Sequence, residues 1–276
     1  MALNQFIPAI WSARILKKLE KNLVFGQPGV VNTDYQGEIT AFGDRVHVHS
    51  FADLTIGDYV KNTTTIAYEL LNDSRVTLVI DQSKYFAFRV DDVDQAQQHP
   101  KIIDAASARA SYQLAETADR YLSGRYTEAA AGNIIAASQF TAANVYTKFV
   151  ELSVKMDEGN VPSEGRFAIV PPWVAGLLQQ NSSFLSAQPE TVLNGAVGQV
   201  AGISILKSNN VVATGTSPVV HHIVAGVADA WSFAQQIASV EALRLEGSFA
   251  DGVRGLHLYG GKVLIPELLY DVRANV

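Results

Sequence analysis

Residues Asn160 to Leu178 read NVPSEGRFAIVPPWVAGLL, and this stretch decides how the rest of the chain is interpreted. Arg166 to Val170 is a short apolar run after a polar turn, a pattern typical of a buried strand. Two prolines follow. Because proline lacks the backbone N–H, they end a strand ladder and suit the first turn of a helix. We therefore predict a strand that leads at once into a helix with Trp173, Leu177 and Leu178 on its apolar face.

Two helices are predicted before this corner. Apolar side chains recur at intervals of three and four residues from about Pro100 to Leu122, which predicts a helix buried along one face. At about 1.5 Å per residue this helix spans roughly 30 Å, the length of a small domain. A shorter helix is predicted from about Ala142 to Met156.

Two strands joined by a long polar segment are predicted nearer the N-terminus. Arg45 to Phe51 alternates in polarity, and Arg75 to Asp81 is rich in β-branched residues. The polar segment TIGDYVKNTTT, residues 55–65, lies between them. Because an isolated two-stranded ribbon is only marginally stable in water, we expect this excursion to lie against another chain.

Four further segments complete the expected secondary structure. An amphipathic helix from about Ala9 to Phe25 forms an N-terminal arm that packs on its own or a neighbouring subunit, with a membrane-surface role as the alternative. Gly198 to Val211 predicts a glycine turn and a strand. His221 to Glu246 predicts a strand, an alanine-rich helix and another strand. Gly255 to Val272 predicts two strands separated by a break at its pair of glycines.

The composition excludes several classes of function. Of the 276 residues, 48% are hydrophobic, enough for a sizeable core, and none is cysteine, which excludes disulfides, cysteine-ligated zinc and thiol nucleophiles. A net charge of −6 argues against a broad nucleic-acid-binding surface. Charged residues make up 17%, against roughly 25% in an average soluble domain, which suggests surface buried against other subunits. No apolar stretch reaches the roughly 18 residues of a membrane span, so we expect no membrane association and no signal peptide.

The sequence predicts no catalytic, cofactor or metal site. His47 and His49 share one face of a predicted strand and His221 begins a second histidine pair, but no third ligand is identified beside either pair. A histidine-dependent metalloenzyme is kept as a remote alternative. Residues 255–263, GLHLYGGKV, nearly match a phosphate-binding loop, yet an extra glycine displaces Lys262 and a valine follows where serine or threonine is needed.

Five stretches, taken in their order along the chain, carry a resemblance to a known family: GDRVHVHSF, LVIDQSKYFAFRVDDVDQAQ, NVPSEGRFAIVPPWVAGLL, GQVAGISILKSNNV and GLHLYGGKVLIPELL. Together they resemble the major capsid proteins of tailed bacteriophages of the Hong Kong 97 type, over nearly the whole chain. The order and spacing of the stretches make the resemblance specific. It implies an α+β fold with an N-arm, an extended β-hairpin loop, a peripheral domain with a long spine helix, and an axial domain.

The resemblance also divides the chain into these parts. The N-arm corresponds to residues 1–35 and the extended loop to residues 36–87. The peripheral domain corresponds to residues 88–164 and 241–276, with the spine helix at about 100–122, and the axial domain to residues 165–240. In this division the proline corner anchors the first strand and helix of the axial domain.

The function implied by the resemblance is structural rather than enzymatic. Such a subunit assembles as hexamers and pentamers, in the host cytoplasm, into the icosahedral head of a virion that encloses double-stranded DNA without sequence-specific binding. Because little chain precedes the arm, a separate scaffolding protein is expected, together with a portal and decoration proteins; no cofactor is expected. The nearest alternative is an encapsulin-type nanocompartment shell, which shares the fold.

The candidate contacts between subunits lie in the loop and the arm: Asp58, Tyr59, Lys61, Trp11 and Arg14. Some members of the family form covalent cross-links between a loop lysine and a distant asparagine. Lys61 lies in the corresponding loop, but neither its asparagine nor an activating glutamate is identified, so we expect no cross-link.

Overall fold

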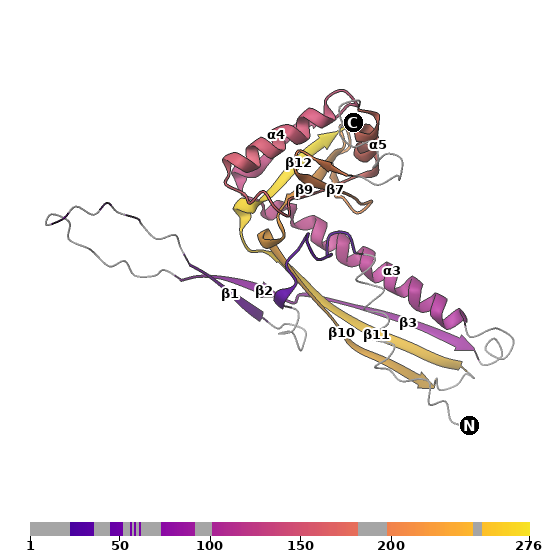
Figure 1. Ribbon diagram of the computed structural model, residues 1–276. Helices are drawn as coiled ribbons and strands as arrows, with labels where there is room; N and C mark the ends of the chain where they lie inside the picture. Colours follow the sequence, from indigo (N-terminus) through magenta and orange to yellow (C-terminus); the bar gives the residue numbers. More distant parts are fainter. Residues whose placement is uncertain are drawn as a thin grey trace.

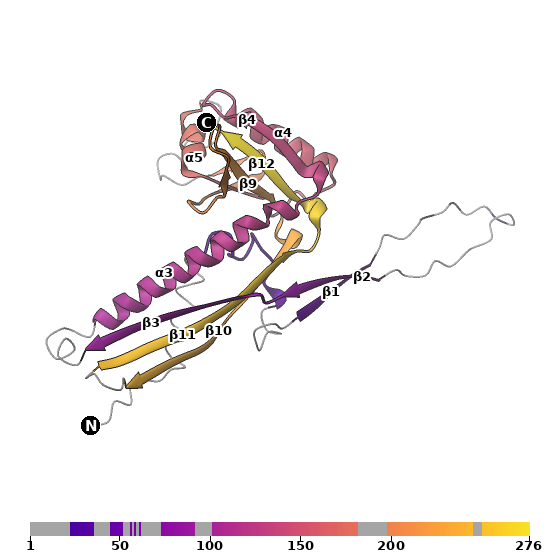
Figure 2. The same ribbon diagram turned by 180° about the vertical axis from the view of Figure 1, so that it is seen from behind.

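The structure, a computed structural model, describes residues 23–35, 45–51, 56, 58, 61, 73–91, 101–181, 198–244 and 250–276. Within these ranges the strands form sheets of two, three and seven strands. The seven-stranded sheet lies at one end of the elongated three-stranded sheet (Figure 1). From the same end, the two-stranded sheet of β1 (Arg45–Phe51) and β2 (Asp73–Val79) extends in the opposite direction (Figure 2).

The seven-stranded sheet and two helices enclose the first hydrophobic core. The helices are α4 (Val145–Glu158) and α5 (Pro172–Gln180), whose buried side chains share this core with the sheet. The strand order is β4 (Ile134–Gln139), β12 (Leu269–Asn275), β9 (Val220–Gly226), β5 (Phe167–Val170), β7 (Ile203–Lys207) and β6 (Gln199–Val200), and β8 (Ala213–Thr214) pairs with β9.

The three-stranded sheet and the long helix form a second core. The sheet has the order β10 (Trp231–Arg244), β11 (Ala250–Val263) and β3 (Gln82–Asp91). The helix α3 (Lys101–Ser123) runs along the sheet in both views (Figures 1 and 2). Its buried side chains join those of β10 and β11 in one cluster. No helix in the described ranges combines the length and apolarity needed to cross a membrane.

The proline corner and both predicted helices near it are confirmed. All four residues of β5 are buried, and α5 begins at Pro172, directly after the strand. Leu178 is buried, whereas Trp173 and Leu177 pack half-buried against the same core. The long helix and α4 also lie where the apolar spacing placed them.

The alanine-rich helix predicted within residues 221–246 is wrong. After β9 and a short 3₁₀ turn, the chain forms β10, which pairs with β11 along its whole length. Trp231 and Phe233 are fully buried in the second core, so burial and cross-strand pairing override the helical tendency of the alanines.

The strand break predicted at the glycine pair is also wrong, because β11 continues through Gly260 and Gly261. A Cβ atom added to Gly260 would lie 2.2 Å from the carbonyl oxygen of Val79, and one on Gly261 would lie 2.8 Å from the side chain of Leu122. These glycines therefore permit the end of β2 and the end of α3 to approach the sheet closely.

Several boundaries expected between domains fall inside structural units. Residue 87 lies within β3, which belongs to the three-stranded sheet, so the excursion ends near Ile80 instead. β4 and α4 share a core with β5, and β12 is inserted between β4 and β9. The cause is the pairing of β12, which draws residues from both expected domains into one sheet. Nearly all of the expected arm helix lies outside the described residues; Leu23 to Phe25 at its end are not helical.

Candidate assembly surfaces

The β1–β2 ribbon is covered only at its base within the part of the chain that the structure describes. Arg45 pairs with Val79 at the base, and Phe51 pairs with Asp73 at the far end, which is directed away from α3 in both views (Figures 1 and 2). A small core at the base joins side chains of the ribbon to β10 and β11: Val46, Leu78, Ile80, Ala234 and Leu258. The ribbon is thus a projection anchored at one end.

The segment beyond the ribbon exposes an apolar side chain between polar ones. Ile56 is 96% exposed, and burying such a side chain would contribute about 2 kcal/mol. Of the contact residues expected from the sequence, Asp58 and Lys61 are exposed here. Tyr59, Trp11 and Arg14 lie outside the described residues.

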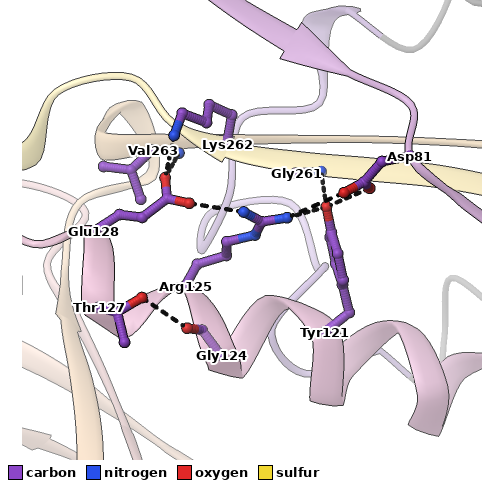
Figure 3. A network of polar contacts seen from close by, with 9 residues as sticks. All are labelled: Asp81, Tyr121, Gly124, Arg125, Thr127, Glu128, Gly261, Lys262 and Val263. Carbon is purple, nitrogen blue, oxygen red and sulfur yellow. Dashed lines mark hydrogen bonds and ion pairs between the residues drawn. The ribbon is translucent and has the colours of Figure 1, made fainter. Parts of the chain in front are cut away.

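A polar network fixes the base of the ribbon to the helix and the sheet (Figure 3). The Tyr121 hydroxyl, near the end of α3, donates to Asp81 Oδ1 at 2.7 Å and accepts a hydrogen bond from Arg125. Arg125 Nη1 donates to Glu128 Oε1 at 2.7 Å, and the other oxygen of Glu128 lies 2.9 Å from Lys262 Nζ on β11. These five side chains, which we call the base clamp, connect three segments that are distant in sequence.

The environment of the base clamp keeps each member in a defined charge state. Burial and the hydrogen bond to Asp81 raise the pKa of Tyr121 to about 12, so its hydroxyl stays a donor at neutral pH. Burial opposes ionisation of Glu128, but hydrogen bonds from Lys262 and Arg125 outweigh it and lower the pKa. Glu128 is therefore a stable anion between two cations.

A buried carboxylate on α3 holds the segment that follows the arm. Asp119 Oδ2 accepts the backbone N–H of Val24 at 2.9 Å, and Oδ1 accepts those of Phe25 at 3.1 Å and Gly26 at 3.4 Å. The Asn210 side chain adds a further hydrogen bond. Burial raises the pKa of Asp119 to about 6, although all four hydrogen bonds act in the opposite direction.

The same segment then adds to the edge of β10. The Trp231 indole N–H donates to the carbonyl of Val30 at 2.6 Å, while the N–H of Asn32 donates to the carbonyl of Trp231 at 3.1 Å. The N–H of Phe233 donates to the carbonyl of Asn32 at 3.0 Å. Residues 23–35 are thus fixed at two points, on α3 and on β10.

The structure does not bring the candidate metal-binding histidines together. His47 and His49 lie on β1 in the two-stranded sheet, whereas His221 lies on β9 in the seven-stranded sheet. His222 is buried, with Nδ1 3.0 Å from Asp271 and Nε2 2.8 Å from Thr214, so it links β8, β9 and β12. Among the described residues, no three acidic, histidine or cysteine side chains converge as metal ligands. The near match to a phosphate loop is part of the extended strand β11.

Sequence reasoning missed Asp119 and the base clamp. Asp119 lies four residues after the buried Ala115, so helical spacing places it on the apolar face of α3, where an acidic residue signals a specific partner. The clamp residues carry no comparable signal, because their partners come from distant segments.

Comparison with known proteins identifies the family. The sequence model described as phage capsid protein matches residues 75–272. The chain belongs to this family. The solved structure described as Mycobacterium phage Che8 shares 28% identity with the capsid protein, with a TM-score of 0.71 over 99% of this chain and 98% of that one. No curated protein sequence matches it.

Two further solved structures share the fold of the capsid protein. The capsid structure of cyanophage P-SCSP1u is 18% identical, with a TM-score of 0.70 over 88% of this chain and 85% of that one. The asymmetric unit of the mature capsid of bacteriophage PhiM1 is 17% identical, with a TM-score of 0.65 over 88% and 87%. The predicted α+β fold of the Hong Kong 97 type is thereby confirmed. The chain is a structural protein of a phage capsid, a virion component that forms a multimeric shell.

Proposed function

We propose that the chain is the major head subunit of a tailed phage, which assembles as hexamers and pentamers into an icosahedral shell around double-stranded DNA. The observation that carries this proposal is the β1–β2 ribbon, which extends from the body with support only at its base among the described residues. In a capsid protein, such a projection gains its remaining contacts from a neighbouring copy. Non-identical surroundings in hexamers and pentamers require a projecting element of this kind to adapt.

The parts of the fold take the roles that the resemblance suggests, with boundaries drawn from the sheets. Residues 1–35 form the arm, and residues 36–80 form the extended loop. The three-stranded sheet with α3 serves as the peripheral domain, and the seven-stranded sheet with α4 and α5 serves as the axial domain. The proline corner then lies at the centre of the axial domain.

The packaged DNA is enclosed rather than gripped. A net charge of −6 leaves no surplus of cations for a sequence-independent coat on phosphates, and the subunit performs no catalysis in this function. A separate scaffolding protein, a portal and decoration proteins are its partners, and assembly takes place in the host cytoplasm.

The test is to express the chain alone and with the candidate scaffolding protein encoded beside it. Size-exclusion chromatography and negative-stain electron microscopy should show closed shells, or discrete hexamers and pentamers, in at least one of the two conditions. A monomer in both conditions would contradict the proposal. Shells that copurify with a stoichiometric enzyme cargo would instead indicate a nanocompartment.

A further inference from the structure

A groove lies between β3 and α3, on the side of β3 that does not pair with β11. It has a volume of about 680 Å³ and is lined by six consecutive residues of β3, Ser83 to Phe88, and by one face of α3. In both views α3 and β11 lie on opposite sides of β3 (Figures 1 and 2). The groove therefore follows the edge of the three-stranded sheet.

We propose that this groove receives the loop segment 52–58 of a neighbouring copy as an added strand, an inference that rests on the proposed shell function. Alternate residues of an edge strand direct their N–H and C=O groups away from the sheet, which is the template for adding a strand. Six residues of β3 offer roughly 20 Å of such edge. That length matches a segment of six or seven residues.

The walls of the groove select for an apolar and acidic occupant. Phe86 and Phe88 are stacked on one face of β3, and Leu114 of α3 lies in the opposite wall. Lys84 and Arg109 also line the groove, and none of its lining residues in the described chain is acidic. An entering strand must therefore supply apolar side chains at alternate positions and carboxylates near the two cations.

Segment 52–58, ADLTIGD, has this pattern. Leu54 and Ile56 alternate with Asp53 and Thr55, and Asp58 follows, so one face is apolar while the segment is acidic. Ile56 is 96% exposed in the isolated subunit and gains burial in the groove. The ribbon is directed away from the α3 of its own subunit, so the occupant comes from another copy (Figures 1 and 2).

The absence of cysteine from the sequence makes a direct test possible. A chain that carries both Ile56→Cys and Gln113→Cys, the latter in the α3 wall, is assembled and then oxidised. Non-reducing electrophoresis should show a ladder of covalent oligomers, because a disulfide forms only between neighbouring side chains. The matched control combines Ile56→Cys with Leu243→Cys on β10, the strand of the sheet furthest from β3. It should give no ladder.

A charge exchange supplies an independent measurement. Lys84→Glu with Arg109→Glu should lower particle yield by about tenfold or more, and adding Asp53→Lys with Asp58→Lys should restore it. Two results would overturn the groove assignment and leave the shell function intact: normal particles in which the Gln113→Cys chain gives no ladder, or a ladder from the Leu243→Cys control instead. A chain that forms no particles even with a scaffolding protein would overturn both.

Discussion

Asp119 accepts the backbone N–H of Phe25 at 3.1 Å across a sequence separation of 94 residues. The same carboxylate accepts the N–H groups of Val24 and Gly26, so one side chain of the long helix fixes the point at which the arm leaves the body. Whatever path the arm takes upstream, it starts from this carboxylate.

Asp119→Ala should lower the free energy of unfolding by about 1–3 kcal/mol, because it leaves three backbone donors without their acceptor. Urea denaturation measures the loss, and hydrogen exchange should show reduced protection at Val24 to Gly26. Glu116→Gln on the same helix is the control, since its pair with Arg120 is exposed and should change stability by less than about 0.5 kcal/mol. Unchanged protection at these amides would contradict the assigned anchor.

The stabilisation that Asp119 provides should depend on pH. Its pKa is about 6 in the folded protein against an ordinary value of 3.8, so the folded state binds the proton more tightly. Stability from this group is therefore fully present below about pH 4 and is lost as the pH rises through 6. The cost of Asp119→Ala should be larger at pH 4.5 than at pH 7.5 by about 2 kcal/mol. A cost that is constant, or that grows with pH, would refute the raised pKa.

The base clamp should matter more than its charges alone suggest. Arg125→Gln removes the cation shared by Tyr121 and Glu128, whose side chains are largely shielded from water, and should cost about 1–3 kcal/mol of unfolding free energy. Arg254→Gln is the matched control, because its pair with Glu241 is exposed and should contribute close to zero. Equal effects of the two substitutions on the urea midpoint would show that the clamp is not specific.

Gly260→Ala should destabilise the junction between the ribbon and the body by about 3 kcal/mol. Its Cβ would lie 2.2 Å from the carbonyl oxygen of Val79, so the backbone of β2 or β11 must shift. Gly132→Ala is the control, since no atom lies within 4 Å of the added Cβ. Thermal unfolding of the two variants checks the difference, and similar midpoints would argue against the close crossing.

Local chemistry explains which parts of this fold could be predicted from the sequence. The proline corner and α3 follow from backbone constraints and apolar spacing that act within a few residues. β10 could not be predicted, because its alanines and glutamines suit a helix and only the distant β11 and the buried Trp231 make it a strand. The base clamp escaped for the same reason, since its partners lie far apart in sequence.

Deleting residues 55–65 should leave a folded subunit that no longer forms stable shells, since the segment's partner is another chain. Circular dichroism and the urea midpoint should match those of the intact protein, while electron microscopy should show no closed particles. Normal particles from the shortened chain would contradict the role of the loop.

The position of β12 bears on how subunits are made. β4 pairs with β12 and not with any other described strand, and β12 also separates β4 from β9. During translation, residues 134–139 and α4 must therefore wait for residues 269–275 to leave the ribosome before their sheet can close. Chains whose synthesis stops early cannot complete this domain, so the order of the strands acts as a proofreading step that keeps incomplete polypeptides out of the shell.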